Sequence, residues 1–395
     1  MHVLIIPSTY PKYKGDLSGI FFQDQAVALR KNGCEVGVIC PEITSIRNLR
    51  NISKIKWGFE KITDDGLRVV KFHALNYFPL IHSLYFQWTR YLYKKLFKKY
   101  TILYGIPDII HAHEIFNGGL LAVEIGEKFG IPVLITEHSS AFALRNFSPT
   151  KLRLARNACN KSKINIAVSN SLAEFLNAKI KASSKWIYLP NMLDDIFTEY
   201  KYEEYQQEKF TFICVGSLDS NKNHIAAIEA FAREFGKDEN KKLIIIGAGE
   251  ELGKLISRTE TLNVRSKIDF LGELSRIDVL KYITQSNVMV LPSKYETFGV
   301  VLIESLALGR PVIATRCGGP ESIVRQQDGL LIEPNDINAL SLAMKSMVKN
   351  YENYNSLEIR QACIERFGSR SIAKKIINNY SEIISENIKY KNKIK

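Results

Sequence analysis

The stretch YETFGVVLIESLALGRP, residues 295–311, reads as a helix that is apolar on nearly every side and yet carries two carboxylates. Glu296 stands at its start and Glu304 in its middle. A glutamate is rarely buried without a partner, because an unpaired buried charge is costly. Two kinds of partner are open at this point: an arginine such as Arg310 or Arg316 in a structural ion pair, or a bound polar ligand.

A strand, NVMVLPS, precedes this stretch, and the next strand begins at Pro311. The loop KYET leaves the first strand, and the helix runs from Phe298 to a stop at Gly309. The free amide groups near Phe298, Gly299 and Val300 then form an anion site at the helix start. We expect Gly299 to let a phosphate approach the backbone closely.

The spacing of the two glutamates gives the site a length. At 1.5 Å per residue they lie roughly 12 Å apart along a helix axis. That length suits a ligand with a polyhydroxylated ring at each end and a diphosphate between them at the helix start. A nucleoside-diphosphate sugar has this layout.

The whole chain alternates short β-branched runs with longer amphipathic ones, which predicts parallel sheets covered by helices. The pattern starts afresh after a polar stretch near residues 191–209, so we predict an α/β protein of two Rossmann-like, doubly wound domains facing a central cleft. Their ligands should bind at the carboxyl ends of the strands. The predicted domains are residues 1–195 and 196–370, with residues 371–395 as a helix crossing back to the first domain.

The composition limits the classes of binding partner and the location that we expect. The 395 residues carry a formal charge of +13, which favours an anionic partner such as a nucleotide, a phosphorylated substrate or an acidic membrane. The six cysteines are scattered through apolar text, as expected for reduced core residues of a cytoplasmic protein. The first apolar run is too short for a signal peptide, and no stretch approaches the ~18 apolar residues of a membrane span.

The combined motif resembles a known family. The text ETFGVVLIESLALGRPVIAT, followed by CGGPESI, is similar to the signature of the retaining glycosyltransferases of family four, also called group one, which have the GT-B fold. The resemblance implies transfer of a hexose-type sugar from a nucleoside-diphosphate sugar to a glycan or lipid-linked glycan, in bacterial surface polysaccharide or lipopolysaccharide biosynthesis. It implies neither a metal nor another cofactor.

The resemblance also implies that residues 1–195 bind the acceptor and residues 196–370 bind the nucleotide sugar. It gives roles to single residues of the second domain as well. In VGSLDSNKN (215–223) the family usually has an arginine where this chain has Ser217, and Lys222 matches the family lysine that binds the donor diphosphate. Glu296 would hold hydroxyls of the donor sugar and Glu304 the ribose. The helix start, Thr297, Phe298, Gly299 and Val300, would meet the diphosphate.

In the first domain the resemblance points to Gly19 and His138. Gly19 matches a glycine-containing loop that lies against the donor phosphate and the acceptor. His138, which ends a strand in LITEHSS, matches the family histidine near the transferred sugar. The catalytic pair is thus His138 and Glu296. His111 and His113 also close a strand and could line the acceptor side.

Three alternative functions are an NAD-binding enzyme, a nucleotide-sugar epimerase and a nucleic-acid binder. The stretch IGAGEELGK (246–254) lacks the spacing of a dinucleotide fingerprint, so we read it as a turn. A nucleotide-sugar epimerase has the same fold, but its cluster of catalytic acids is missing. A nucleic-acid binder would explain the charge and leave the glutamates unexplained.

One further segment, residues 84–105, could place the protein at a membrane surface. Residues 84–105 combine Trp88, Leu92 and Leu96 at helical spacing with five basic residues, a composition suited to the cytoplasmic face of an anionic membrane. A domain helix with a basic solvent face fits the same text. The sequence leaves the sugar, the base, the acceptor and the oligomeric state open.

Overall fold

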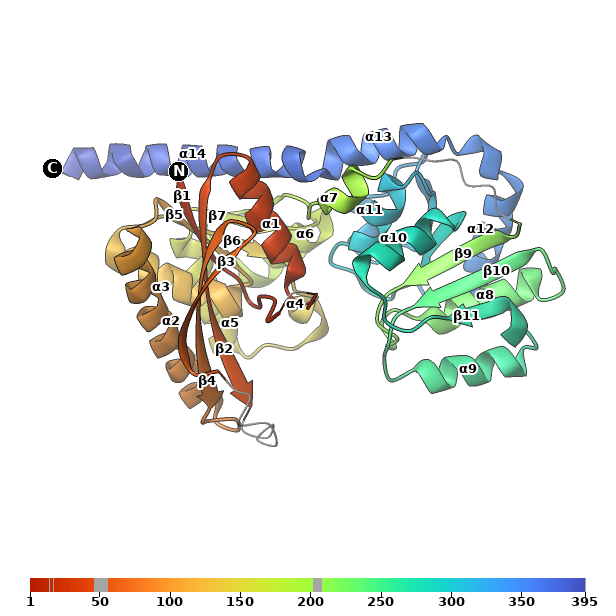
Figure 1. The fold of residues 1–395 in the computed structure, drawn as a ribbon, viewed down its shortest axis with the longest axis horizontal. Coiled ribbons are helices and arrows are strands. Elements are labelled where there is room, and N and C mark those ends of the chain that lie inside the picture. The colour runs from red at the N-terminus through yellow and green to blue at the C-terminus, as the bar shows by residue number, and fades with distance from the viewer. Residues whose placement is uncertain (14, 17, 46–55, 202–207, 395) are drawn as a thin grey trace. The chain divides into compact units, whose positions relative to one another are not determined.

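The structure, a computed structural model, describes residues 1–394 except residues 14, 17, 46–55 and 202–207. It divides into two compact units (Figure 1). Unit 1 comprises Met1–Ala167, Ala173–Leu189 and Ile372–Lys395, and unit 2 comprises Val168–Leu172 and Pro190–Ser371. The chain therefore forms most of unit 1, then unit 2, and returns to unit 1 in its last helix.

Unit 1 is built on an eight-stranded sheet in the order β3-β4-β2-β1-β5-β6-β7-β8. All neighbouring strands are parallel except β3 and β4. The strand order reverses between β1 and β5, and doubly wound sheets bind their ligands outside the carboxyl ends at such a point. The strands are β1 (His2–Ile6), β2 (Glu35–Ser45), β3 (Gly58–Asp64), β4 (Leu67–Asn76), β5 (Ile109–His113), β6 (Val133–Glu137), β7 (Ile164–Ala167) and β8 (Trp186–Tyr188).

From the sequence, no strand is predicted where β3 lies. Strand β3 forms a hairpin with β4, and Asp64 lies opposite Leu67. The two turn residues, Asp65 (φ 45°) and Gly66 (φ 77°), are both left-handed. Asp-Gly between alternating residues is a strong signal for such a hairpin, so the sequence contained the information.

The helices of unit 1 follow the amphipathic stretches. The sequence predicts a helix from about Ile20 to Asn32 with a stop at Gly33. Helix α1 confirms this by ending at Lys31, with Gly33 in a left-handed conformation (φ 92°). The bounds are α1 (Ile20–Lys31), α2 (His82–Tyr104), a π-helix η2 (Ile115–Gly119), α3 (Leu120–Phe129), α4 (Ala141–Leu144), α5 (Pro149–Lys161) and α6 (Asn170–Ile180), whose first residues belong to unit 2.

Helix α2 favours the second interpretation of residues 84–105, a domain helix with a basic solvent face. Leu92 and Leu96 are fully buried, so the apolar stripe belongs to the core of unit 1. Two of the basic residues are already paired, because Arg90 and Lys94 both contact Glu124, at 2.5 and 2.6 Å. Over most of its length α2 is therefore a helix packed against the rest of unit 1, with its basic residues on the solvent side. No helix in the described part of the chain is long and apolar enough to span a bilayer.

Unit 2 is built on a six-stranded sheet, and all its pairings are parallel. Its order, β11-β10-β9-β12-β13-β14, reverses between β9 and β12. The β-branched runs at 210–216, 242–249, 267–272, 287–292, 311–315 and 328–332 predict six strands, and all six are present. The strands are β9 (Phe210–Val215), β10 (Lys241–Ile246), β11 (Ile268–Phe270), β12 (Val288–Leu291), β13 (Val312–Thr315) and β14 (Gly329–Ile332).

Helices cover this sheet through a core in which Phe212, Phe231 and Met344 are fully buried. All six cysteines of the chain are buried and unpaired. The helices are α7 (Asp195–Thr198), α8 (His224–Phe235), α9 (Leu252–Thr261), η3 (Arg265–Lys267), α10 (Arg276–Thr284), α11 (Val300–Ala307), η4 (Pro320–Ser322), α12 (Ile337–Lys349), η5 (Tyr351–Asn353), α13 (Ser356–Phe367) and α14 (Ser369–Ile394), which continues into unit 1.

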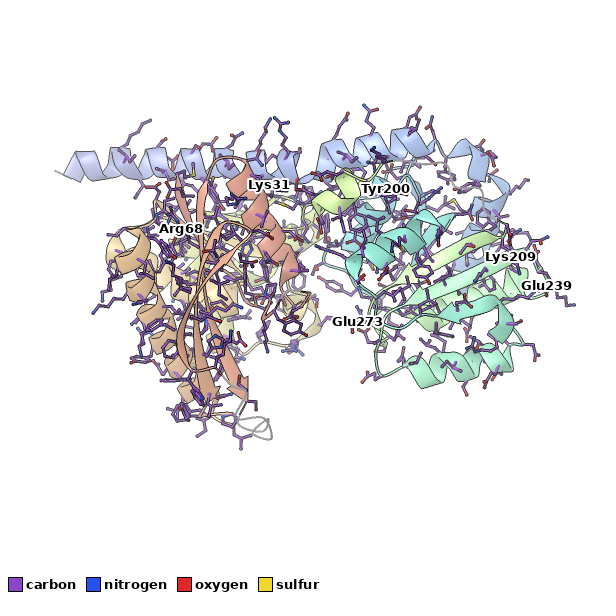
Figure 2. All side chains as sticks on the ribbon, viewed as in Figure 1. Lys31, Arg68, Tyr200, Lys209, Glu239 and Glu273 are labelled. Atoms are coloured by element: carbon purple, nitrogen blue, oxygen red, sulfur yellow. The ribbon has the colours of Figure 1, made fainter. Side chains whose placement is uncertain are left out.

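The carboxyl edge of the unit 2 sheet is where the loops of interest lie. Glu273, which follows β11, marks this edge, whereas Lys209 and Glu239 mark the edge at which β9 and β10 begin (Figure 2). The loops after β9 and β12 leave the sheet on either side of the reversal of strand order. This is the place at which such a sheet binds a ligand.

Candidate functional site

The loop after β9 is shaped by Asp219. Its carboxylate accepts hydrogen bonds from the Ser217 hydroxyl (2.6 Å) and from the backbone N–H groups of Asn221 (2.9 Å) and Lys222 (3.0 Å). Such bonds from a carboxylate to a nearby backbone hold a turn in one conformation. The turn presents Lys222 from a fixed backbone, and the exposed Ser217 stands beside it.

Lys222 and Glu296 meet in this site. The Lys222 ammonium donates to Glu296 Oε1 at 2.5 Å, and the Ser293 hydroxyl donates to the same oxygen at 2.8 Å. Glu296 is 9% exposed, so its charge is compensated by these two donors. Spacing and resemblance identified the lysine and the glutamate, but Ser293 was missed because a serine at the end of a strand carries no signal of its own.

The backbone on both sides of Glu296 is tied to the loop after β13. The Glu296 N–H donates to Cys317 O (3.2 Å), and the Gly319 N–H donates to Glu296 O (2.8 Å). A Cβ on Gly319 would lie 2.4 Å from the nitrogen and the Cα of Phe298. The glycines of CGGPESI therefore serve a close backbone approach that fixes the position of Glu296.

Helix α11 begins two residues later than the sequence suggested. Gly299 is its N-cap, with φ 102° and ψ 63°, a conformation that only glycine adopts readily. A Cβ there would lie 3.3 Å from the Leu302 side chain and 3.4 Å from that of Leu291. A side chain at this position would thus face the protein interior, and a close approach of phosphate to this backbone stays a prediction. Backbone conformation is what requires the glycine.

The residues around the helix start divide into backbone and side-chain contributors. Phe298 is 1% exposed and its ring packs edge-on against Phe367, with ring centroids 5.9 Å apart, so only its backbone can contact a ligand. Thr297 and Val300 are half-buried. The first N–H groups of a helix have no partner within the helix and carry its positive dipole end.

Glu304 lies one turn into α11 and is 8% exposed. Because Glu296 precedes the helix, the estimate of roughly 12 Å along one axis is wrong; only Val300 to Glu304 is helical, which is roughly 6 Å. Arg310, one of the two arginines considered as its partner, is itself buried and donates to Thr284 O at 2.8 Å.

The glycine-rich turn after β10 supports the same loop. A Cβ on Gly247 would lie 1.8 Å from Gly216 O, and one on Gly249 would lie 2.4 Å from Leu218 O. The Leu218 N–H donates to Ala248 O at 2.9 Å. These glycines let two loops pack backbone to backbone, so the turn is structural, as the spacing predicted.

His224, at the start of α8, is a residue that the sequence reasoning missed. Its Nε2 lies 3.2 Å from Ser217 O and donates to it. Burial lowers the pKa of His224 to about 4, so the ring is neutral at physiological pH. It adds a further hydrogen bond that fixes the loop carrying Lys222.

In unit 1, His138 follows β6 and lies within a cluster of rings. Its Nε2 is 3.0 Å from His113 Nδ1, and its ring packs edge-on against Phe22 with centroids 5.3 Å apart. It is partly exposed. The ring is thus oriented by its neighbours before a ligand binds.

His111 and His113 do not line a surface, contrary to the sequence expectation. Both are fully buried, and burial lowers the pKa of His111 to about 3 and that of His113 well below its ordinary value. His111 Nδ1 lies 2.6 Å from the hydroxyl of Tyr380 on α14, and its Nε2 lies 2.7 Å from Thr136 Oγ1. Its role is to hold the last helix on the sheet of unit 1.

Glu137, immediately before His138, is a buried carboxyl that the sequence reasoning also missed. It accepts hydrogen bonds from the N–H groups of Ile115 (3.0 Å), His138 (3.1 Å) and Ser139 (2.8 Å). Burial, with the charge of Glu114 second, raises the pKa of Glu137 to about 8 against the effect of these bonds. The carboxyl therefore fixes the backbone on which His138 stands.

Gly19 caps α1 in the left-handed conformation (φ 74°). A Cβ there would lie 2.6 Å from Thr9 O and 2.7 Å from Thr9 Oγ1. The loop between β1 and α1 thus folds back on itself at this glycine. Packing accounts for the residue, and a contact with donor phosphate stays a prediction.

Two family models match the chain. The family model "Glycosyl transferases group 1" matches residues 197–366, and "Glycosyltransferase Family 4" matches residues 19–195. These matches favour a transferase over an epimerase of the same fold.

Two curated relatives and one solved structure illustrate the similarity. N-acetyl-alpha-D-glucosaminyl L-malate synthase of Bacillus anthracis is 26% identical over 71% of this chain and 76% of the relative. "Putative teichuronic acid biosynthesis glycosyltransferase TuaC" of Bacillus subtilis (strain 168) is 25% identical over 87% and 88%. The crystal structure of Anabaena Alr3699/HepE in complex with UDP has a TM-score of 0.73 and 17% identity, covering 97% of this chain and all of that one. The last shows a shared fold.

Proposed function

The chain belongs to the group 1 glycosyltransferases, with the two Rossmann-like units of the GT-B fold, and from this premise we propose that it transfers a hexose-type sugar from a nucleoside diphosphate to a glycan or lipid-linked glycan. We propose further that the anomeric configuration is retained. The observation that carries the donor assignment is the ion pair of Lys222 and Glu296 beside the N-terminus of α11.

The donor diphosphate would bind to Lys222 and to the first N–H groups of α11. Charge-assisted hydrogen bonds and a helix N-terminus both favour a phosphate. Because Lys222 is already bonded to Glu296 at 2.5 Å, an arriving diphosphate competes for the ammonium. Binding of the donor then releases acceptor capacity on Glu296. That carboxylate is free to bind hydroxyls of the donor sugar.

Glu304 would accept hydrogen bonds from the ribose hydroxyls. It stands one turn beyond the helix start and keeps 8% exposure, which suits a carboxylate at the closed end of a site. The structure of HepE with UDP supports a nucleotide donor for a protein of this fold.

His138 would hydrogen-bond a hydroxyl of the transferred sugar and so orient the reacting centre. Its contacts with His113 and Phe22 fix the ring in advance. Gly19 would place the loop after β1 against the donor phosphate. Both assignments rest on the family resemblance.

The reaction breaks the bond between the anomeric carbon and the phosphate oxygen and forms one to the acceptor oxygen. The acceptor proton passes to the leaving phosphate. Lys222 and the α11 N-terminus offset the charge that develops on the diphosphate, so we propose that turnover needs no divalent metal. Turnover that persists in excess EDTA supports this, and turnover that stops until Mg²⁺ or Mn²⁺ is restored contradicts it.

We propose a role in bacterial surface polysaccharide or lipopolysaccharide assembly at the cytoplasmic face of the membrane. The name of the Bacillus subtilis relative supports the setting. Leu80, Ile81 and Leu84, just before and at the start of α2, are 76%, 51% and 42% exposed, and the net charge of +13 favours an anionic bilayer.

Vesicle flotation tests the membrane proposal. The chain should float with vesicles of phosphatidylcholine and phosphatidylglycerol, and the double variant Leu80→Asp, Ile81→Asp should stay behind. Leu342→Asp is the matched control, since this leucine is 62% exposed on α12. Equal flotation of the parent and both variants would contradict the proposal.

Release of nucleoside diphosphate from a panel of nucleotide sugars tests the proposed function. Release should need an acceptor, and product NMR should show the donor's anomeric configuration. Glu304→Ala should lower kcat/KM about 100-fold, the scale of one or two lost charged hydrogen bonds. Glu333→Ala, whose side chain is 72% exposed, should match the parent. If Glu304→Ala retains full turnover, the ribose role is wrong.

A further inference from the structure

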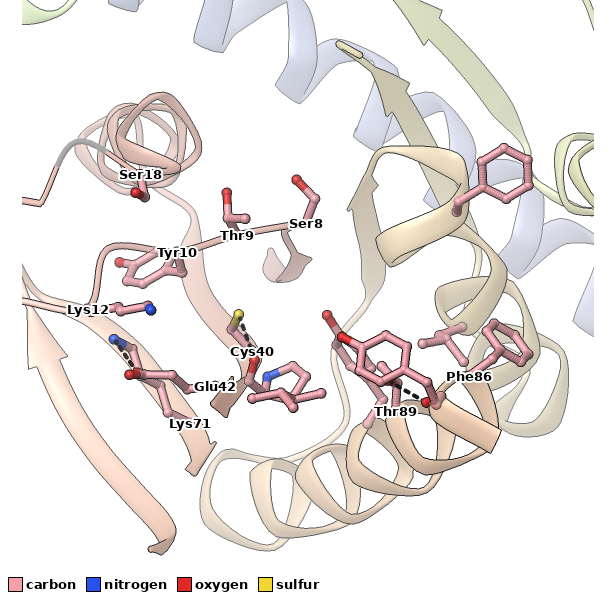
Figure 3. A pocket seen from close by; sticks show the side chains of 16 residues that line it. Ser8, Thr9, Tyr10, Lys12, Ser18, Cys40, Glu42, Lys71, Phe86 and Thr89 are labelled. Atoms are coloured by element: carbon pink, nitrogen blue, oxygen red, sulfur yellow. Dashed lines mark hydrogen bonds and ion pairs between the residues drawn. The ribbon is translucent and has the colours of Figure 1, made fainter. Parts of the chain in front are cut away.

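A pocket of about 400 Å³ lies within unit 1 at the carboxyl ends of β1 and β2. One side is formed by the loop after β1 together with Glu42 of β2 and Lys71 of β4, and the other by aromatic side chains of α2 and η2. Figure 3 shows Lys12, Lys71 and Glu42 on one side of the pocket and Phe86 on the other.

Lys71 is the unusual member of this lining, because its side chain is almost fully enclosed in the middle of a strand. The residue is 3% exposed, and its ammonium donates to Pro11 O at 2.6 Å. It lies 5.5 Å from the centre of the Tyr10 ring. A lysine is rarely buried unless an anion offsets its charge.

Glu42 offsets this charge only in part. Its Oε2 lies 3.9 Å from Lys71 Nζ, beyond hydrogen-bond range, and 3.7 Å from His73 Nδ1. An ammonium has three N–H donors, and Pro11 O takes one. Lys71 therefore keeps donor capacity at the pocket, and Glu42 offsets its charge only in part.

The Tyr10 ring beside Lys71 is held in place by a hydrogen bond of its hydroxyl. The Tyr10 hydroxyl donates to Asp64 at 3.1 Å, and Gln23 Nε2 donates to the same carboxylate oxygen at 2.5 Å. Lys12, on the same loop, is exposed and adds a second positive charge. The polar side thus offers two cations for an acid group and one carboxylate, Glu42, for hydroxyls.

We infer that this pocket binds the acceptor through an anionic group on a hydroxylated molecule, with the acid group against Lys71 and Lys12 and hydroxyls against Glu42. The aromatic side, which includes Tyr85, Phe86 and Phe116, covers the apolar face of the same molecule. A sugar acid and a sugar phosphate both have this chemistry. The inference rests on the proposed function, because it names the class of acceptor.

Saturation-transfer NMR with three matched sugars tests it: glucuronate, which carries a carboxylate; glucose 6-phosphate, which carries a phosphate; and neutral glucose. One or both anionic sugars should bind, and the stronger tells which acid group the acceptor carries. Glucose should bind at least about tenfold more weakly, the scale of one charge-assisted hydrogen bond. If glucose binds as well as both anions, the inference is wrong.

Variants locate the site. Lys71→Met keeps the stem and should abolish the preference for the anions, whereas Lys71→Arg, which keeps the charge, should retain it. Lys163→Met is the control, since that lysine of unit 1 is exposed. An unchanged preference in Lys71→Met overturns the inference. If Lys71→Met does not fold, loss of the preference in Lys71→Arg overturns it instead, and retention supports it.

Nucleoside-diphosphate binding, measured in parallel, separates this inference from the proposed function. A chain that binds a nucleoside diphosphate and does not discriminate the sugars loses only the acceptor inference. A chain that discriminates the sugars and binds no nucleoside diphosphate loses the proposed function.

Discussion

At the scale of single residues, the proposed donor site is a set of charges that hydrogen bonds hold in position. Asp219 fixes the backbone of Lys222, Ser293 fixes the carboxylate of Glu296, and the two charges meet at 2.5 Å. Preorganised charges stabilise a developing charge without a cost of reorganisation. The exposed Ser217, where the resembling family has an arginine, leaves this set one cation short.

Ser217→Arg should therefore strengthen donor binding. A guanidinium beside Lys222 adds a charge-assisted hydrogen bond to the diphosphate, so the donor KM should fall about tenfold. Initial rates at varied donor concentration give the value. Ser257→Arg, at an exposed position of α9, controls for added charge and should leave KM unchanged. A donor KM that stays the same in both variants would show that the diphosphate does not pass this position.

Glu137 makes the unfolding free energy depend on pH. Its folded-state pKa, about 8, lies above the ordinary value of 4.5, so between these values the folded state holds a proton that the unfolded state has lost. The contribution to stability is complete below about pH 4.5 and is lost as pH rises through about 8, at no more than about 1.4 kcal/mol per pH unit.

Glu137→Gln should remove this decline. Urea unfolding of the parent and the variant at pH 5, 6, 7 and 8 gives the difference, in which groups common to both cancel. The parent should lose stability relative to Glu137→Gln as pH rises. Glu174→Gln, at an exposed position of α6, should run parallel to the parent. A constant difference between Glu137→Gln and the parent at all four values would mean that this carboxyl does not titrate there.

At the scale of elements, the start of α11 depends on one glycine. Gly299 combines φ 102° with side-chain contacts at 3.3 and 3.4 Å, so a β-carbon is both strained and tightly placed. Thr297, Phe298 and Val300 keep their backbone positions only if this cap is kept.

Gly299→Ala should lower the free energy of unfolding by about 1–2 kcal/mol, the cost of a left-handed conformation for a residue with a β-carbon. Donor KM should rise with it, because the helix start shifts. Gly253→Ala is the matched control: it lies within α9 with nothing within 4 Å of the added carbon, and alanine favours a helix. Urea unfolding and donor kinetics measure both effects. Equal stabilities of the two variants would refute the strain argument.

Much of this level could be predicted. Alternation of β-branched and amphipathic runs predicted every parallel strand, and the preceding strand and the stop at Gly309 located α11 to within two residues. Strand β3 was missed because about half of its side chains face solvent. The Asp-Gly turn that follows it is its main sequence signal. The burial of Phe298, His111 and Leu92 could not be predicted, because each depends on a neighbour distant in sequence, such as Phe367 or Tyr380.

At the scale of the whole molecule, the chain uses one architecture twice. Each sheet reverses its strand order once, between β1 and β5 in unit 1 and between β9 and β12 in unit 2. The residues of interest cluster at these points: the Lys71 pocket beside the first and the pair of Lys222 and Glu296 at the second. The two sheets thus carry the two ligand sites that we propose, one for each substrate of a transfer reaction.

The central claim is that unit 2 holds the donor diphosphate through Lys222, and titration calorimetry of nucleoside diphosphates tests it most directly. With the nucleotide that binds most tightly in a panel of UDP, ADP and GDP, Lys222→Ala should raise Kd at least about tenfold, the loss of one charge-assisted bond. Lys294→Ala, which removes an exposed lysine from the neighbouring loop, should bind like the parent. An unchanged Kd in a folded Lys222→Ala protein would contradict the account.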